Sequence, residues 1–342
     1  MEFNAPVEKK RIAKWDNLKA LLIFTIVIGH MADYYTDNSV DMRRVFLFIY
    51  TFHMPAFLFI SGLFSKKNID EKRYSNIFSY LILYYVIKIL IFVTRRMING
   101  EGDWSLLEED GSPWYAFALF AYCFMTIFMK KLEKKYAMMI AIIAGCLVNY
   151  DSSIRDFLVL ARILVFYPFF LAGYYMNPKK IVEKLDKNYI KIVGFISFIA
   201  LAFIVIVKVE LLYDLRPLLT GRNPYSEMEI FTQFDAMLRL GYYALVFVLV
   251  FLIIALVPKR KLLITKWGKN SISIYAIHRC IIYILFDGLG GMVLFKKIYP
   301  EHPDWLIIPT ALLITILLSP DFIAKGLHYV IKPKLVEDVE KN

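Results

Sequence analysis

Residues 19–30 read Lys19-Ala-Leu-Leu-Ile-Phe-Thr-Ile-Val-Ile-Gly-His30, an apolar run with a cation at one end and a histidine at the other. Such a run is typical of a membrane-spanning helix, in which ionisable side chains are costly and therefore mark candidate functional sites. Eleven residues make about three helical turns, which places Lys19 and His30 on one helix face, roughly 16 Å apart. We expect this face to accommodate a ligand with an anionic head and a long arm.

Similar apolar stretches recur along the whole chain. The protein has 342 residues, of which 59% are hydrophobic, and its mean hydropathy is +0.54. This pattern predicts an all-α, polytopic membrane helical bundle of about ten transmembrane helices. The expected spans are 18–36, 45–64, 74–93, 114–129, 136–149, 157–176, 189–207, 238–257, 270–286 and 304–324. We expect one membrane domain over residues 1–342, with short cytoplasmic tails at 1–17 and 326–342, because no interval between spans is long enough to bury a second core.

Basic residues predict the orientation of the bundle because they gather in alternate loops. The basic segments are 9–14, 66–73, 130–135, 179–191, 259–269 and 325–341. Positive-inside topology therefore predicts that both termini are cytoplasmic and that the protein spans the cell (plasma or inner) membrane several times. The net charge of +11 is dispersed over these short segments rather than clustered on one face, so we expect no nucleic-acid partner.

The cysteines and the first residues carry weaker signals. Cys123, Cys146 and Cys280 lie in apolar spans and are odd in number, which predicts core packing and no disulfide framework or metal site. Residues 1–17 are too polar for a signal peptide, so we expect the first span to remain as an uncleaved helix.

Three of the five histidines fall inside expected spans. His30 and His53 come from adjacent spans of opposite direction, and both are expected about 9 to 12 Å below the outer boundary. His278 lies near the middle of the ninth span, so the three imidazoles can converge on one polar chamber. One such histidine alone is often only a hydrogen-bonded packing residue, but a cluster favours catalysis. Histidine exchanges a proton near neutral pH, as acyl transfer to an alcohol requires. His302 and His328 lie in or near aqueous flanks.

Other polar residues are candidate substrate-binding groups. Arg162 and Arg279 lie inside expected spans and must find carboxylates, carbonyls, water or substrate there. The expected carboxylate partners are Asp33, Asp156 and Asp235. Tyr275 lies three residues before His278 and shares its helix face. Asp33, Arg162, Tyr275 and Arg279 are therefore assigned to substrate binding. The expected outer loop 208–237 mixes charges, amides and prolines, which fits a cap over an outward-facing cavity or an ordinary solvated loop.

The second span carries a further set of signals, beginning with Phe52-His53-Met54-Pro55. Pro55 removes a backbone donor beside His53, and Ser61-Gly62 lets a helix or a ligand arm approach closely. The cations that follow can hold phosphates, although positive-inside topology alone also supplies them. They are Lys66, Lys67, Lys72 and Arg73.

Five blocks in order along the chain resemble the acyltransferase-3 family of integral membrane acyltransferases. The likeness is greatest to its branch of fucose 4-O-acetylases and related sugar O-acetyltransferases. The blocks are Trp15-Asp16-Asn17-Leu18-Lys19 through Gly29-His30, Phe52-His53-Met54-Pro55 through Ser61-Gly62, Pro113-Trp114-Tyr115, Pro168-Phe169-Phe170-Leu171-Ala172-Gly173-Tyr174, and Gly268-Lys269-Asn270-Ser271-Ile272-Ser273-Ile274-Tyr275-Ala276-Ile277-His278.

The resemblance implies an O-acetyltransferase with ten membrane helices. Its donor would be cytoplasmic acetyl-CoA, with no metal, and its acceptor a hydroxyl of a glycan or lipid-linked sugar at the bilayer. His30 would be the essential histidine, acting as general base or passing acetyl onward covalently, while His53 and His278 orient the acceptor or relay protons. Lys19 stands where many members have arginine. The predicted CoA-binding cations are Lys19, Lys66, Lys67 and Arg73, and lysine keeps the charge without the bidentate fork of arginine.

Two other functions remain open from the sequence. A proton-coupled transporter of a polar or sugar-like solute would use His30, His53 and Arg162 as its pathway, although the chain shows no inverted repeats or matched broken helices. A structural partner of a glycan-export complex would need none of the histidines for turnover.

Overall fold

The computed structural model describes residues 12–100, 104, 111–154, 157–229 and 233–332, and in this part every regular element is helical. The α-helices are α1 (Ala13–Ala32), α2 (Val40–Asp70), α3 (Tyr74–Asn99), α4 (Trp114–Met129), α5 (Lys134–Leu147), α6 (Leu160–Tyr175), α7 (Pro178–Leu185), α8 (Asn188–Val207), α9 (Val209–Asp214), α10 (Arg216–Thr220), α11 (Asp235–Leu256), α12 (Thr265–Lys269), α13 (Ser271–Tyr283), α14 (Gly291–Ile298), α15 (Ile307–Leu318) and α16 (Asp321–Ile331). Short turns are η1 (Asp33–Tyr35), η2 (Val148–Tyr150), η3 (Tyr225–Glu227), η5 (Pro303–Leu306) and a π turn, η4 (Ile284–Gly288).

The all-helical membrane class predicted from the sequence is confirmed, while the number of spans stays a prediction. Each expected span overlaps a helix. Among the described residues, six helical stretches are long and apolar enough to cross a membrane, and a seventh qualifies if the pair α14 and η5–α15, bent by 107°, counts as one span. Helices α4 and α6 are apolar but shorter. Nearly all of α6 is buried, so protein rather than lipid surrounds it.

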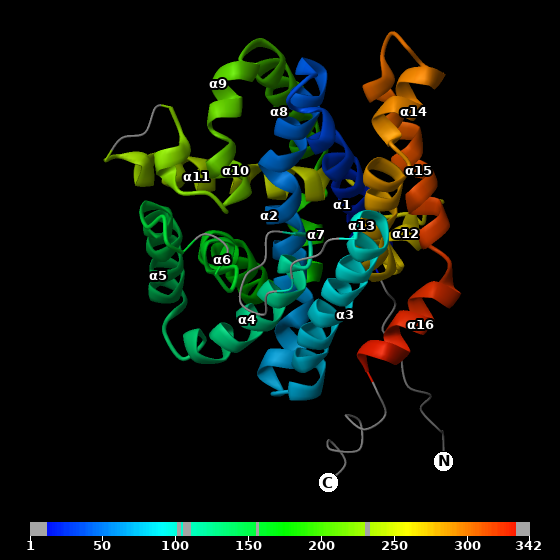
Figure 1. Cartoon of the computed structure of the whole chain (residues 1–342). Coiled ribbons are helices and arrows are strands. Elements are labelled where there is room, and N and C mark those ends of the chain that lie inside the picture. The colour runs from blue at the N-terminus through cyan, green and yellow to red at the C-terminus, as the bar shows by residue number, and fades with distance from the viewer. Residues whose placement is uncertain (1–11, 101–103, 105–110, 155–156, 230–232, 333–342) are drawn as a thin grey trace.

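Helix α2 runs through the middle of the bundle, with α4 to α6 on one side and α13 to α16 on the other (Figure 1). Its first turn is capped by Ser39, whose hydroxyl accepts the N–H of Met42 at 3.2 Å. Pro55 has no N–H to give to the carbonyl of Thr51, and the hydroxyl of Tyr242 donates to that carbonyl instead at 3.4 Å. The long helix therefore continues past its proline with the exposed carbonyl satisfied.

Two glycines allow α2 and α6 to cross in backbone contact. A Cβ atom on Gly62 would lie 2.0 Å from the carbonyl oxygen of Phe170, and one on Gly173 would lie 2.0 Å from that of Phe59. Small residues at a helix crossing let the two backbones approach in this way. The expectation that Ser61-Gly62 admits a close neighbour is thus met by α6.

Parts of both expected tails, 1–17 and 326–342, belong to helices of the bundle. Helix α1 starts inside the segment 1–17, which we expected to be a tail. Lys14 Nζ donates to the carbonyls of Ala255 at 3.2 Å and Val257 at 2.5 Å, where α11 ends, and the Asn17 amide donates to two carbonyls of the following loop. These side chains satisfy carbonyls that the end of α11 leaves without helical partners, which is why the segment is buried.

The expected last span, 304–324, is divided. Helix α15 ends before Pro320, and α16 begins directly after this proline, continuing into the segment 326–342 that we expected to be a tail. The side chain of Lys332 donates to Asn76 of α3, so the end of α16 is fixed to the bundle.

The described part of the segment 208–237, residues 208–229 and 233–237, packs against one end of the bundle through α9, α10 and η3. Arg239 of α11 is fully buried beneath it. Its guanidinium donates to the carbonyl of Leu218, to Oδ1 of Asn149 at 3.4 Å and to the hydroxyl of Tyr225 at 3.4 Å. A buried cation with several acceptors holds this segment in place over the helices.

Candidate active site

A polar cavity of about 810 Å³ lies between the segment 208–237 and the helices beneath it. Its lining includes four arginines, Arg162, Arg216, Arg222 and Arg279, together with His30 and His53. Acidic side chains of the segment itself complete the wall, and Trp114, Tyr50 and Tyr213 add aromatic surface. The sequence prediction of a cap over a cavity agrees with this arrangement, although Asp156 and residues 230–232 lie outside the described part of the chain. We name this space the large cavity.

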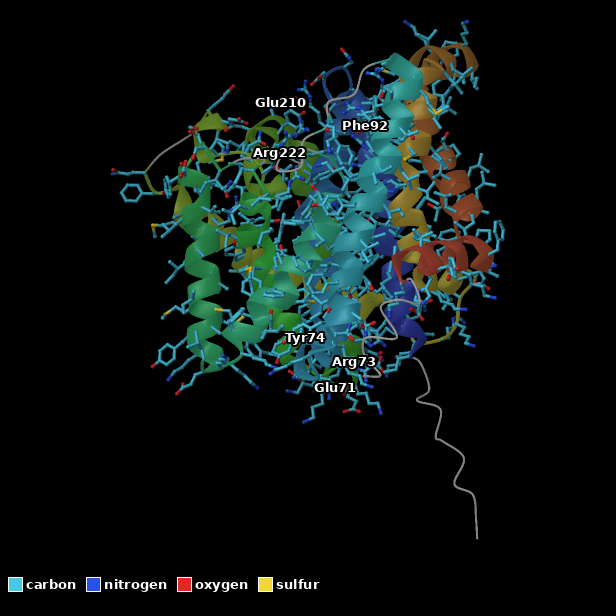
Figure 2. The ribbon with its side chains drawn as sticks, turned by 60° about the horizontal axis from the view of Figure 1, so that its bottom comes forward. Glu71, Arg73, Tyr74, Phe92, Glu210 and Arg222 are labelled. Carbon is cyan, nitrogen blue, oxygen red and sulfur yellow. The ribbon has the colours of Figure 1, made fainter. Side chains whose placement is uncertain are left out.

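A second cavity of about 230 Å³ continues toward the opposite end of the bundle. Its wall is mainly apolar, with Ile23, Ile26 and Phe57 among its lining residues, and Lys19 and Lys269 also line it. Figure 2 shows Glu210 and Arg222 toward one end of the bundle, and Glu71 and Arg73 at the other. We name this space the narrow cavity.

The two cavities meet at one group of side chains. His30, Met54, Ser112 and Trp114 line both of them. His30 is therefore reached from the end that carries Lys19 and from the end that carries Arg222. The face from Lys19 to His30 that the sequence predicts is the wall of this passage.

The structure brings the three predicted histidines together. The rings of His30 and His278 stack with centroids 5.4 Å apart, and His53 lines the large cavity beside His30. His53 Nδ1 lies 2.8 Å from the carbonyl of Ile49, and His278 Nδ1 lies 2.9 Å from that of Ile274. A carbonyl only accepts, so each Nδ1 carries the proton and each Nε2 is left as an acceptor in the neutral ring.

His278 differs from the other two histidines in access. Its side chain is 0% exposed and lines neither cavity, and its Nε2 has no hydrogen-bond partner among the described residues. It therefore packs against the ring of His30 and does not border the space that a substrate would occupy. In the part of the chain that the structure describes, no group of three His, Cys, Asp or Glu side chains is arranged to hold a metal ion.

The intramembrane arginines also line the large cavity. Arg162 is 8% exposed and lies over the Trp114 ring at 5.3 Å, and Arg279 lies over the Tyr283 ring at 4.8 Å. Nε and Nη1 of Arg279 are buried without a hydrogen-bond partner within the described residues. Asp33 forms an ion pair with Arg216 of α10 at 2.7 Å. Its role as a partner of Arg162 or Arg279 stays a prediction. Asp235 is buried in the first turn of α11.

Tyr275 has a positioning contact rather than a free hydroxyl. Its oxygen accepts the N–H of Ala116 at 3.1 Å and donates to the carbonyl of Ser112 at 2.9 Å, while its ring lines the narrow cavity. These bonds fix the start of α4 and so place Ser112 and Trp114 where the cavities meet. Sequence reasoning did not assign a site role to these two residues, although Trp114 lies in one of the blocks quoted above.

The predicted phosphate-binding cations divide into two groups. Lys19 lines the narrow cavity and pairs with Asp16 at 2.9 Å. Lys66, which pairs with Asp70 at 2.8 Å, Arg73, which pairs with Glu71 at 2.6 Å, and the exposed Lys67 line neither cavity. Their role in holding phosphate stays a prediction.

Lys269 is the second cation of the narrow cavity, and sequence reasoning placed it only among the positive-inside residues. It lines the same cavity as Lys19 because Gly268 lets α12 touch α1: a Cβ on Gly268 would lie 1.6 Å from the carbonyl oxygen of Asp16. This contact joins parts of the chain that are far apart in sequence, so spacing along one helix does not reveal it.

Comparison with known proteins gives a family match and a weaker match to a curated protein. The acyltransferase-3 family model, described as an acyltransferase domain, matches residues 12–323. The nodulation protein NolL of Mesorhizobium japonicum (strain LMG 29417 / CECT 9101 / MAFF 303099) is 27% identical over 126 residues, which are 32% of this chain and 34% of that protein. The match thus spans about a third of the relative's length. No solved structure matches the chain.

Proposed function

The chain belongs to the acyltransferase-3 family, and from this membership we propose that it is a membrane O-acyltransferase that moves acetyl from cytoplasmic acetyl-CoA to a hydroxyl of a surface or exported glycan. One observation carries the proposal. Two cavities of different character approach His30 from opposite ends of the bundle and share it as a wall residue. A donor and an acceptor can therefore meet at one imidazole without passing each other.

The narrow cavity is the proposed donor site. Its apolar wall suits a thin, uncharged arm, and its two cations, Lys19 and Lys269, suit the phosphates of coenzyme A as point charges. The acetyl thioester would then lie at His30. Lys66, Lys67 and Arg73 would act only on the parts of the nucleotide that stay outside the cavity.

The large cavity is the proposed acceptor site. Its volume is within the range of ordinary ligand pockets, and its mixture of charged and aromatic side chains suits the hydroxyls and ring faces of a sugar. Arg162, which lies over Trp114, and Asp33, which pairs with Arg216, would orient the acceptor. Tyr275 would hold the start of α4, and so position Ser112 and Trp114 where the two cavities meet.

The transfer needs one base and one oxyanion partner. His30 would take the proton of the acceptor hydroxyl while that oxygen forms a bond to the thioester carbon. When the tetrahedral intermediate collapses, the carbon–sulfur bond breaks and the thiolate takes the proton from His30. Arg279 lines the same cavity and would stabilise the oxyanion, because its Nε and Nη1 have no partner among the described residues. His278 would hold the ring of His30, and His53 would orient the acceptor.

A transfer assay with a matched histidine control tests this function. In purified protein in nanodiscs, His30→Ala should lower acetyl transfer from acetyl-CoA by roughly 10²- to 10⁴-fold, the usual contribution of a general base. His328→Ala removes an exposed imidazole on α16, outside both cavities, and should keep wild-type turnover. Full activity of His30→Ala would overturn the proposal.

The alternative of a proton-coupled transporter predicts a different result from the same preparations. Solute flux would follow a proton gradient without coenzyme A, and it would depend on His30, His53 and Arg162. Folded wild-type protein that neither binds nor hydrolyses acetyl-CoA but shows such flux would favour the transporter.

A further inference from the structure

The narrow cavity contains a hydroxyl pair that the proposed mechanism does not use. Ser61 Oγ and the hydroxyl oxygen of Tyr115 lie 2.7 Å apart, and both residues line this otherwise mainly apolar space. Ser61 Oγ also donates to the carbonyl of Phe57 at 2.8 Å. Ser61 has then used its only proton, so Tyr115 donates to Ser61, and the free lone pairs of the two oxygens accept hydrogen bonds from a ligand.

The position of this pair along the cavity follows from the packing of α1 against α2. The helices run in opposite directions, because Gly29 lies against Tyr50 while Trp15 contacts Phe64 with ring centroids 6.0 Å apart. Met54 shares the junction with His30. Ser61 follows seven residues later, which is about 10 Å farther along the helix axis.

Lys19 lies farther from the junction than the hydroxyl pair does. The Nζ of Lys19 is 6.0 Å from the ring centroid of Phe64, which lies ten residues and about 15 Å beyond Met54 along α2, whereas Ser61 lies about 10 Å beyond Met54. The order along the cavity is therefore His30, then the hydroxyl pair, then the cations.

We propose that Ser61 and Tyr115 form a subsite for the pantetheine arm of the donor and bind the amide that is farther from sulfur. In an extended arm, standard bond lengths place the nitrogen of this amide about 10 Å from the thioester carbon and the first phosphorus about 18 Å from it. With the thioester at His30, the amide N–H meets the hydroxyl pair and the phosphates meet Lys19 and Lys269. The inference rests on the proposed function, because it assigns the donor a pantetheine thioester.

Three acetyl donors of different length distinguish binding at this subsite from binding elsewhere in the cavity. Acetyl-CoA has both amides and the phosphates, acetyl-pantetheine has both amides without the nucleotide, and S-acetyl-N-acetylcysteamine has only the amide near sulfur. Ser61→Ala and Tyr115→Phe should raise KM by roughly 3- to 10-fold for the first two donors and leave KM unchanged for the third. Lys19→Ala should raise KM for acetyl-CoA alone.

A second hydroxyl pair in the same bundle provides the control. Tyr167 and Thr126 share a hydrogen bond of 3.0 Å between buried hydroxyls, and neither residue lines a cavity. Tyr167→Phe makes the same chemical change as Tyr115→Phe, and its KM for all three donors should match wild type.

The outcomes separate the inference from the function on which it rests. Equal increases in KM for all three donors, including the shortest, would show that the pair only supports the fold and would overturn the subsite. Wild-type protein that transfers acetyl from none of the three would overturn the proposed function and the subsite together.

Discussion

Arg279 has more unused hydrogen-bonding capacity than its neighbours in the large cavity. Its Nε and Nη1 are buried without partners among the described residues, although its guanidinium lies over Tyr283. If it binds the oxyanion, Arg279→Lys keeps the charge but loses the two-donor fork. We expect kcat to fall by roughly 10²- to 10³-fold, as when an oxyanion donor is removed, while KM for acetyl-CoA stays close to wild type.

The control for Arg279 is an arginine that lies away from the cavities. Arg44→Lys changes a residue paired with Asp41 on the same helix at 2.8 Å, outside both cavity linings. Its turnover should equal that of wild type. A change confined to KM in Arg279→Lys would instead assign this arginine to ground-state binding of a substrate.

Residues on one helix face could be predicted from the sequence, and residues that meet through tertiary contacts could not. The spacing of Lys19 and His30 fixes their common face because the helical repeat is fixed. Similar depths in adjacent spans predicted that His30 and His53 would share one chamber, and the place of His278 near the middle of its span allowed it to reach the same chamber. Lys269 and Ser112 were missed, since their positions depend on how α12 and α13 pack. The ion pair of Asp33 with Arg216 was missed because it depends on how α10 packs.

The placement of α12 depends on the absence of a side chain at Gly268. A Cβ on Gly268 would lie 1.6 Å from the oxygen and 2.5 Å from the carbon of the Asp16 carbonyl, so Gly268→Ala must push α12 away from α1. We expect a loss of about 1 to 3 kcal/mol in stability, as for other overpacked sites. Because Lys269 ends α12, KM for acetyl-CoA should rise as well. Thermal unfolding followed by tryptophan fluorescence measures the first effect.

A second glycine-to-alanine variant distinguishes the loss of stability caused by crowding from the general effect of adding a methyl group to a helix. A Cβ on Gly241 of α11 meets no atom within 4 Å, so Gly241→Ala should be neutral or slightly stabilising. Equal stability of Gly268→Ala and Gly241→Ala would contradict the close contact between α12 and α1.

Most elements were predictable because long apolar runs determine membrane helices. The exceptions share a physical cause. The bend of 107° before α15 and the π turn η4 depend on packing rather than on apolar periodicity. Helix α16 is a separate amphipathic helix that begins after Pro320, so the apolar span expected over 304–324 is divided there. The capping of α11 by Lys14 likewise joins two distant segments.

For the whole molecule, the proposed reaction requires the two cavities to face different compartments. The narrow cavity reaches the end that carries Lys19, where acetyl-CoA would be available only if that end is cytoplasmic. The large cavity is lined by Glu210 and Arg222, which Figure 2 places toward the end of the bundle opposite to Arg73. The distribution of basic loops predicts this orientation independently of the cavities.

The orientation can be measured because Cys123, Cys146 and Cys280 are buried and free, which keeps background labelling low. Ser226→Cys places a thiol on the exposed part of the segment 208–237, and Lys131→Cys places one on the exposed turn after α4. In intact cells, a membrane-impermeant maleimide should label Ser226→Cys, whereas Lys131→Cys should react only after permeabilisation. The reverse pattern would place the narrow cavity outside the cell, where acetyl-CoA is absent, and would contradict the donor assignment. Transfer activity retained in both variants would show that the labelled proteins are folded.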